Sequence, residues 1–252
     1  MNSNVIRLGI AAAAVVLAII IGINLLPGPN VGGPGPSPSQ TTASSASTAP
    51  SVTPANFTDY PDGTALTPGS YAFTHLEPVR VSFTVPSGWE KGGLDWVVWS
   101  QEDTKATLAV MTVDNLYVDP CRPDAGLRDP VVGPTVDDLA TALGSVPGLT
   151  FSTPAEVTRA GFTGKYVNFV PPDTFGECAA DISLWSVNGG TSDLPAPTGD
   201  DDPYALFVDD TFRVWILDVN GTRLVITTSA PAGIGASRVT ELRAMIDSIQ
   251  IE

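Results

Sequence analysis

Hydrophobic and polar positions divide the chain into three stretches of different character. Residues 8–26 form an apolar run without a charged side chain. As a helix at 1.5 Å per residue, this run spans about 28 Å, close to the hydrocarbon thickness of a bilayer. Residues 27–56 are rich in Pro, Gly, Ser and Thr and carry no charge, whereas residues 57–252 alternate strand-like and helix-like patterns. The pattern predicts a transmembrane helix, a disordered linker and one folded domain.

The apolar run is interpreted as an uncleaved signal-anchor. A short N-terminus of residues 1–7 precedes it and contains Arg7, and the next Lys or Arg is Arg80. The positive-inside rule therefore keeps the N-terminus in the cytoplasm and sends the rest of the chain across the membrane. The run ends in Leu25-Leu26-Pro27, without small residues at the cleavage positions of a signal peptide. A cleaved signal, with its site in the later Ala/Ser-rich tract, is the alternative.

Period-two alternation predicts several strands in the folded domain. The clearest is 79–85, where apolar and polar residues alternate, and others are predicted at 94–100, 106–113, 182–187 and as a pair within 157–170. Two β-rich runs, 212–219 and 222–228, flank Asn220-Gly221. An Asn-Gly pair between such runs is the strongest short signal for a β-hairpin.

Two helices are predicted from period-3.6 patterns. The first covers 135–144, with Thr135 as N-cap and Asp138 at the third position, which approximates a capping box. The second begins at Ser237, and 249–252 is predicted as a last short strand. Runs of strands with helices near the middle and the end indicate an α+β domain, a mostly antiparallel sheet flanked by helices.

The late hairpin and the final helix are predicted to form the folding centre. A two-residue turn fixes the register, so one face of both strands is committed to the core. The apolar stripe of the helix would cover that face, leaving Arg238 and Glu241 toward solvent; the stripe consists of Val239, Leu242, Met245, Ile246 and Ile249.

Charge limits the classes of partner. The chain has 12 Lys and Arg against 27 Asp and Glu, a net charge of −15. Nucleic acid and anionic lipid headgroups require a basic face, so neither is expected as a partner.

The chain has two cysteines, Cys121 and Cys178, both in the part predicted to be exported. In an oxidising compartment such an isolated pair is expected to form a disulfide, with two free thiols as the alternative.

Candidate chemistry is sparse. No nucleophile elbow, P-loop or HExxH motif is present, and His75 is the single His. A Ser-His-Asp triad would have to use His75, which is better interpreted as a surface or hydrogen-bonded residue. Asp200-Asp201-Asp202 is the best candidate for a Ca²⁺ site, but its spacing does not match an EF-hand loop, and a solvated acidic loop is the preferred interpretation.

The remaining candidates for a ligand-binding site are five tryptophans: Trp89, Trp96, Trp99, Trp185 and Trp215. Aromatic side chains can line a pocket for an apolar ligand or a glycan, although core packing is the default for most of them. Trp96 and Trp99 are three positions apart, so within a strand they face opposite sides.

Three features occur in an order that resembles a known family. They are VPSGW at Val85–Trp89, the late hairpin, and a terminal helix ending in Leu242–Ile251. Together they resemble the PsbP-like fold, in particular exported, membrane-linked actinobacterial domains of the LpqN lipoprotein type. The resemblance implies an antiparallel sheet flanked by helices and a non-enzymatic accessory or binding role. The chain departs from the lipoprotein pattern because no cysteine follows the apolar run.

These observations predict a non-catalytic, membrane-tethered extracytoplasmic domain that binds an envelope protein or a small apolar or glycan ligand. No catalytic, metal-binding or cofactor-binding residue and no cofactor is assigned, and the ligand-binding residues are not identified. An extracellular hydrolase with an unrecognised site, and an envelope signal-sensing module acting through other membrane proteins, are the alternatives.

Overall fold

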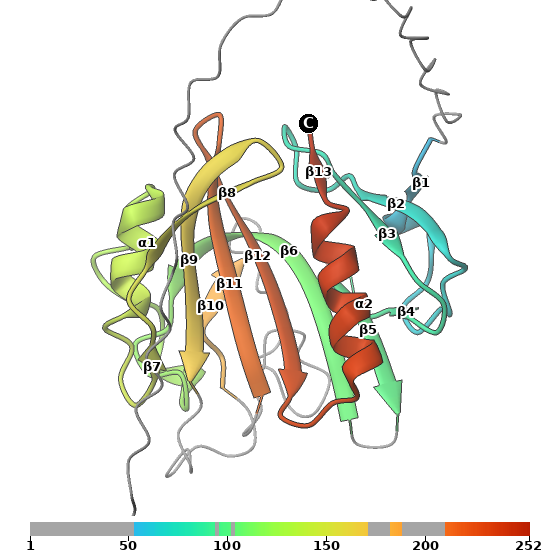
Figure 1. The fold of residues 1–252 in the computed structure, drawn as a ribbon. Helices are drawn as coiled ribbons and strands as arrows, with labels where there is room; N and C mark the ends of the chain where they lie inside the picture. Colours follow the sequence, from blue (N-terminus) through green and yellow to red (C-terminus); the bar gives the residue numbers. More distant parts are fainter. Residues whose placement is uncertain (1–52, 94–95, 102–103, 171–181, 188–209) are drawn as a thin grey trace, which may run out of the picture. The chain divides into compact units, whose positions relative to one another are not determined.

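The computed structural model describes residues 53–93, 96–101, 104–170, 182–187 and 210–252 (Figure 1). Within these ranges, no helix is both long and apolar enough to cross a membrane. The predicted membrane span at 8–26 and most of the linker at 27–56 lie outside the described residues. The described part is a mostly antiparallel β structure with two α-helices, as the sequence predicted.

The larger sheet forms the centre of the fold (Figure 1). Its strands follow the order β4-β5-β6-β12-β11-β9-β7, with β8 paired to β9 and β10 paired to β6, and every pairing is antiparallel. The bounds are β4 Glu90–Lys91, β5 Trp96–Gln101, β6 Thr104–Leu116, β7 Thr150–Phe151, β8 Ala155–Arg159, β9 Phe162–Val170, β10 Trp185–Val187, β11 Asp210–Val219 and β12 Thr222–Pro231.

A second, four-stranded sheet joins the beginning of the domain to its end. Its order is β1-β2-β3-β13, with bounds Ala55–Asn56, Gly69–Phe73, Val81–Val85 and Gln250–Ile251. β1 runs parallel to β2, and β13 pairs antiparallel with β3. The final strand predicted at 249–252 is therefore present. Two short 3-10 helices lie at Phe57–Asp59 and Pro123–Ala125.

The hairpin predicted around Asn220-Gly221 is confirmed. β11 and β12 pair along ten positions up to Val219 opposite Thr222. Asn220 and Gly221 have φ of 53° and 89°. Positive φ at both turn residues characterises the type I′ turn, whose twist matches that of the strands and which Asn-Gly favours.

Both faces of this hairpin are buried, whereas the sequence predicted a single buried face. On one face, Leu217, Leu224 and Ile226 belong to the same core cluster as Met245 of helix α2 (Ala236–Asp247). On the other face lies a second cluster, which includes Leu139 of helix α1 (Val136–Leu143). The two helices therefore cover opposite faces of the large sheet (Figure 1).

The prediction that Arg238 and Glu241 point to solvent is wrong. Their side chains are 25% and 27% exposed and form an ion pair. Arg238 stacks its guanidinium 4.6 Å from the ring centroid of Trp99, and Glu241 accepts a hydrogen bond from the indole of buried Trp89. The sequence could not place these contacts, because Trp89 is 152 positions away from Glu241.

The tryptophans behave mainly as core residues. Trp89, Trp185 and Trp215 are buried. Trp96 packs against the cluster that contains α1, whereas Trp99 packs against the cluster that contains α2. The prediction that Trp96 and Trp99 face opposite sides of a strand is confirmed.

Candidate functional site

A groove of about 390 Å³ lies where α1 meets the β8–β9 hairpin and the turn between β11 and β12. It is the candidate functional site within the described residues. It is lined by Pro134, Thr135, Val136, Asp137, Glu156, Thr163, Gly164, Lys165, Asp218, Gly221 and Arg223. No aromatic residue is among these residues, and five of them carry charged side chains, so the groove is a charged site and not an aromatic pocket.

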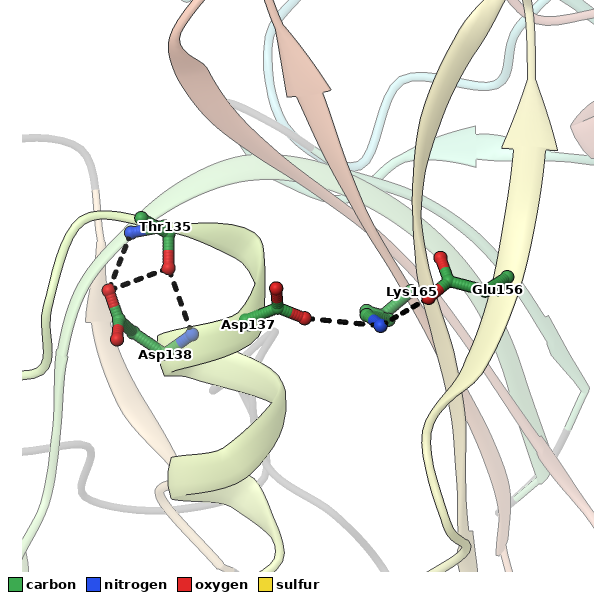
Figure 2. A network of polar contacts seen from close by, with 5 residues as sticks. All are labelled: Thr135, Asp137, Asp138, Glu156 and Lys165. Carbon is green, nitrogen blue, oxygen red and sulfur yellow. Dashed lines mark hydrogen bonds and ion pairs between the residues drawn. The ribbon is translucent and has the colours of Figure 1, made fainter.

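The first wall of the groove is the beginning of α1. The hydroxyl of Thr135 accepts a hydrogen bond of 3.1 Å from the backbone N–H of Asp138. The Asp138 carboxylate accepts one of 2.9 Å from the backbone N–H of Thr135 (Figure 2). This is the reciprocal capping box that the sequence predicted. Hydrogen bonds from the Thr135 hydroxyl and backbone N–H lower the pKa of Asp138, with a further contribution from the charge of Arg223.

Lys165 of β9 joins α1 to the second wall of the groove (Figure 2). Its ammonium lies 2.5 Å from Oε1 of Glu156 on β8 and 3.1 Å from Oδ1 of Asp137 on α1. Hydrogen bonds to Glu156 and then to Asp137 raise the pKa of Lys165, so its charged form is favoured. The two carboxylates are 80% and 76% exposed, which leaves them accessible from the groove.

Arg223, near the start of β12, fixes the loop that leads into α1. Its Nη1 donates to the carbonyls of Gly133 and Thr135, and its Nη2 donates to the carbonyl of Val113 at 2.7 Å. Burial lowers the pKa of Arg223, while the charges of Asp138 and Asp114 oppose that effect. Arg223 therefore positions one wall of the groove through backbone carbonyls.

Gly164 allows the floor of the groove to form. It lies on β9 opposite Leu217 of β11. A Cβ at this position would collide with the carbonyl of Ile216, so a larger residue would force the two strands apart.

None of the sequence-predicted candidates that the structure describes lines this groove. His75 follows β2, and both its ring nitrogens are buried without a hydrogen-bond partner in the described part of the chain. Its ring meets Phe73 edge-on at 5.9 Å. Among the described residues, no Ser-His-Asp arrangement forms around His75.

Other candidate site residues lie outside the part of the chain that the structure describes. The Asp200-Asp201-Asp202 loop is not described, and no group of three or more His, Cys, Asp or Glu in the described ranges could hold a metal ion. Cys178 is also outside these ranges, so its pairing with Cys121 stays a prediction. Cys121 itself follows β6, where its backbone N–H donates to Asp119 at 3.0 Å.

Sequence patterns did not predict the charged residues of the groove, although one signal was present. In a hairpin centred on Ala160-Gly161, Glu156 and Lys165 are directly opposite each other, as observed. Opposite charges at such positions attract, so the pair was accessible from the register alone. The contacts of Asp137 with Lys165 and of Arg223 with Gly133 join distant parts of the chain and carry no local signal.

Comparisons with known proteins do not assign a family. No protein-family model matches this chain, and a search of curated proteins finds no match. The resemblance to PsbP-like domains stays a prediction.

Proposed function

We propose that this chain is a membrane-tethered, extracytoplasmic domain that binds a partner protein or ligand through the groove and has no catalytic activity of its own. The observation that carries the proposal is the pairing of Lys165 with Asp137 and Glu156. A lysine that acts as a base needs a lowered pKa, whereas hydrogen bonds to these carboxylates raise the pKa of Lys165. The groove thus offers fixed charges for recognition.

The proposed tether rests on residues 8–26, with the Pro/Ser/Thr/Gly-rich residues before β1 as a spacer. A chain held by a transmembrane helix stays in the membrane fraction after high salt and reductant, because neither weakens the burial of the apolar run. A mature form in the culture supernatant, with its N-terminus beyond Leu26, would contradict the tether.

Site-specific photo-crosslinking in intact cells tests the binding role. A photoreactive residue replaces Thr163, which lines the groove. The matched control replaces Arg243, which is exposed on α2 and is not part of the groove. We expect a discrete adduct from position 163 and none from position 243. Equal labelling from both positions, or none from either, would argue against recognition through the groove.

The competing enzymatic interpretation has its own test. The purified chain is incubated with generic ester, peptide and glycoside substrates, and we expect no turnover above buffer. Turnover that is lost in Lys165→Met would show that the groove is an active site and would overturn the non-catalytic proposal.

A further inference from the structure

The segment of residues 53–66, here named the N-terminal strap, is the first described part of the folded domain. Its strand β1 pairs with β2, and Oδ1 of Asn56 accepts a hydrogen bond of 2.9 Å from the hydroxyl of Thr74. Phe57 is fully buried and packs edge-on against Phe73 at 4.7 Å. These contacts fasten the beginning of the strap to the end of β2.

Lys91 fastens the other end of the strap. Its carbonyl accepts a hydrogen bond of 2.7 Å from Gly63, and its N–H donates one of 2.9 Å to Thr64. Its ammonium pairs with Asp62 and lies 5.6 Å from the ring centroid of Phe57. The Lys91 side chain is only 6% exposed. A buried cation therefore lies beneath the strap and is bonded to the carboxylate of Asp62.

His75 lies next to the first of these attachments, the hydrogen bond between Thr74 and Asn56. It follows Thr74 directly, its ring contacts Phe73, and the charge of Lys91 acts on it. Both ring nitrogens are buried, and neither has a hydrogen-bond partner in the described residues. Glu77, the acidic residue next along this segment, is exposed, and Asp62 is already bonded to Lys91.

We propose that His75 is an acid-sensitive lock on the N-terminal strap, closed when its imidazole is neutral and opened when the ring takes up a proton. A protonated ring would require two hydrogen-bond acceptors, and the described residues around the closed site provide none to either ring nitrogen. Burial first, and then the charge of Lys91, lower the pKa of His75, which agrees with this geometry. Opening of the strap would let water solvate the ring.

This inference goes beyond the proposed function, because the strap and the groove share no residue. The lock lies at the point where the predicted linker joins the domain. Its use as a sensor of external pH rests on the proposed extracytoplasmic location, but the lock itself does not.

The first measurement is the titration of His75 in the full-length chain in detergent. The chain contains one His, so selective ¹³C labelling of the imidazole gives a single resonance. We expect its midpoint to lie below the ordinary value of 6.5. A midpoint at or above 6.5 would overturn the proposal.

The second measurement is hydrogen–deuterium exchange at several pH values, corrected for the intrinsic rate. We expect exchange in peptides covering 53–66 to rise several-fold across the His75 midpoint, while peptides covering α2 at 236–247 stay unchanged. His75→Leu should remove the pH dependence in the strap. Exchange of the strap peptides that does not change with pH in the wild-type chain would overturn the proposal, and so would the same pH dependence in His75→Leu. If His75→Leu does not fold, the wild-type measurement alone decides.

Discussion

The indole N–H of Trp89 donates a hydrogen bond of 2.9 Å to Oε2 of Glu241. Trp89 is fully buried in the segment between β3 and β4, and Glu241 belongs to α2. A buried N–H without an acceptor is costly, so this carboxylate satisfies a polar group in the core. It also connects the segment after β3 to a helix near the end of the chain.

Replacement of Glu241 by Ala should therefore destabilise the fold by about 1–3 kcal/mol, because Trp89 loses its acceptor. The matched control is Arg243→Ala on the exposed side of α2, which should cost less than about 0.5 kcal/mol. Urea unfolding of both variants measures the difference. Equal losses would show that the Trp89 bond contributes nothing to stability.

Truncation of Ile246 tests the apolar contacts of the same helix. This side chain is 6% exposed and belongs to the core cluster between α2 and the sheets. Ile246→Ala should cost about 2–5 kcal/mol, and the smaller truncation Ile246→Val about 0.5–1.5 kcal/mol. The two variants are compared by urea midpoint at constant slope. Substitutions at exposed positions usually change stability by no more than about 0.5 kcal/mol. A loss of that size or smaller for Ile246→Ala would contradict burial of this side of α2.

The capping box of α1 predicts a change in acid stability. Hydrogen bonds from Thr135 lower the pKa of Asp138 below its ordinary value of 3.8. The ionised carboxylate therefore stabilises the folded state at pH values above 3.8. That contribution is lost as the pH falls through the lower, folded-state pKa. Thr135→Ala should cost about 1 kcal/mol at neutral pH.

Denaturant unfolding of wild type and Thr135→Ala at pH 6 and pH 3 measures this effect. The difference in unfolding free energy between wild type and Thr135→Ala should be smaller at pH 3, because protonated Asp138 no longer accepts these hydrogen bonds as a charged group. A difference in unfolding free energy that does not change with pH would mean that Thr135 stabilises the fold independently of the ionised Asp138 carboxylate.

The predicted Cys121–Cys178 disulfide gives a separate test. Mass spectrometry of non-reduced peptides should detect the two cysteines in one linked species. The double Ser variant should then lose about 2–5 kcal/mol of stability relative to the oxidised protein. Detection of two free thiols in the mature protein would refute the pairing.

The parts of the fold that the sequence predicted are those with local signals. Asn220-Gly221 identified a hairpin because few residues accept positive φ at both turn positions. Thr135 and Asp138 identified the start of α1 because a capping box lies within one helical turn. Each signal depends on neighbours a few positions apart.

The parts that the sequence did not predict depend on distant pairs. Two-sided burial of the hairpin requires β12 to lie beside β6, a pairing that alternation within one strand cannot specify. Glu241 has the character of a surface residue, and only its approach to Trp89 reveals its role. In the groove, Asp137 and Lys165 meet for the same reason, since they belong to different elements.

The closure of the small sheet by β13 has a consequence for synthesis. β3 is translated early, but its partner at residues 250–251 is translated much later. At about 5–20 residues per second, the ribosome needs roughly 10–30 s to make the intervening chain. During that interval the edge of β3 that faces away from β2 lacks its partner β13. An open strand edge is a template for intermolecular pairing. A nascent chain that lacks β13 therefore exposes the backbone edge of Val81 and Ser82 to pairing with other chains, and shielding of this edge until β13 has been made should raise the yield of folded protein.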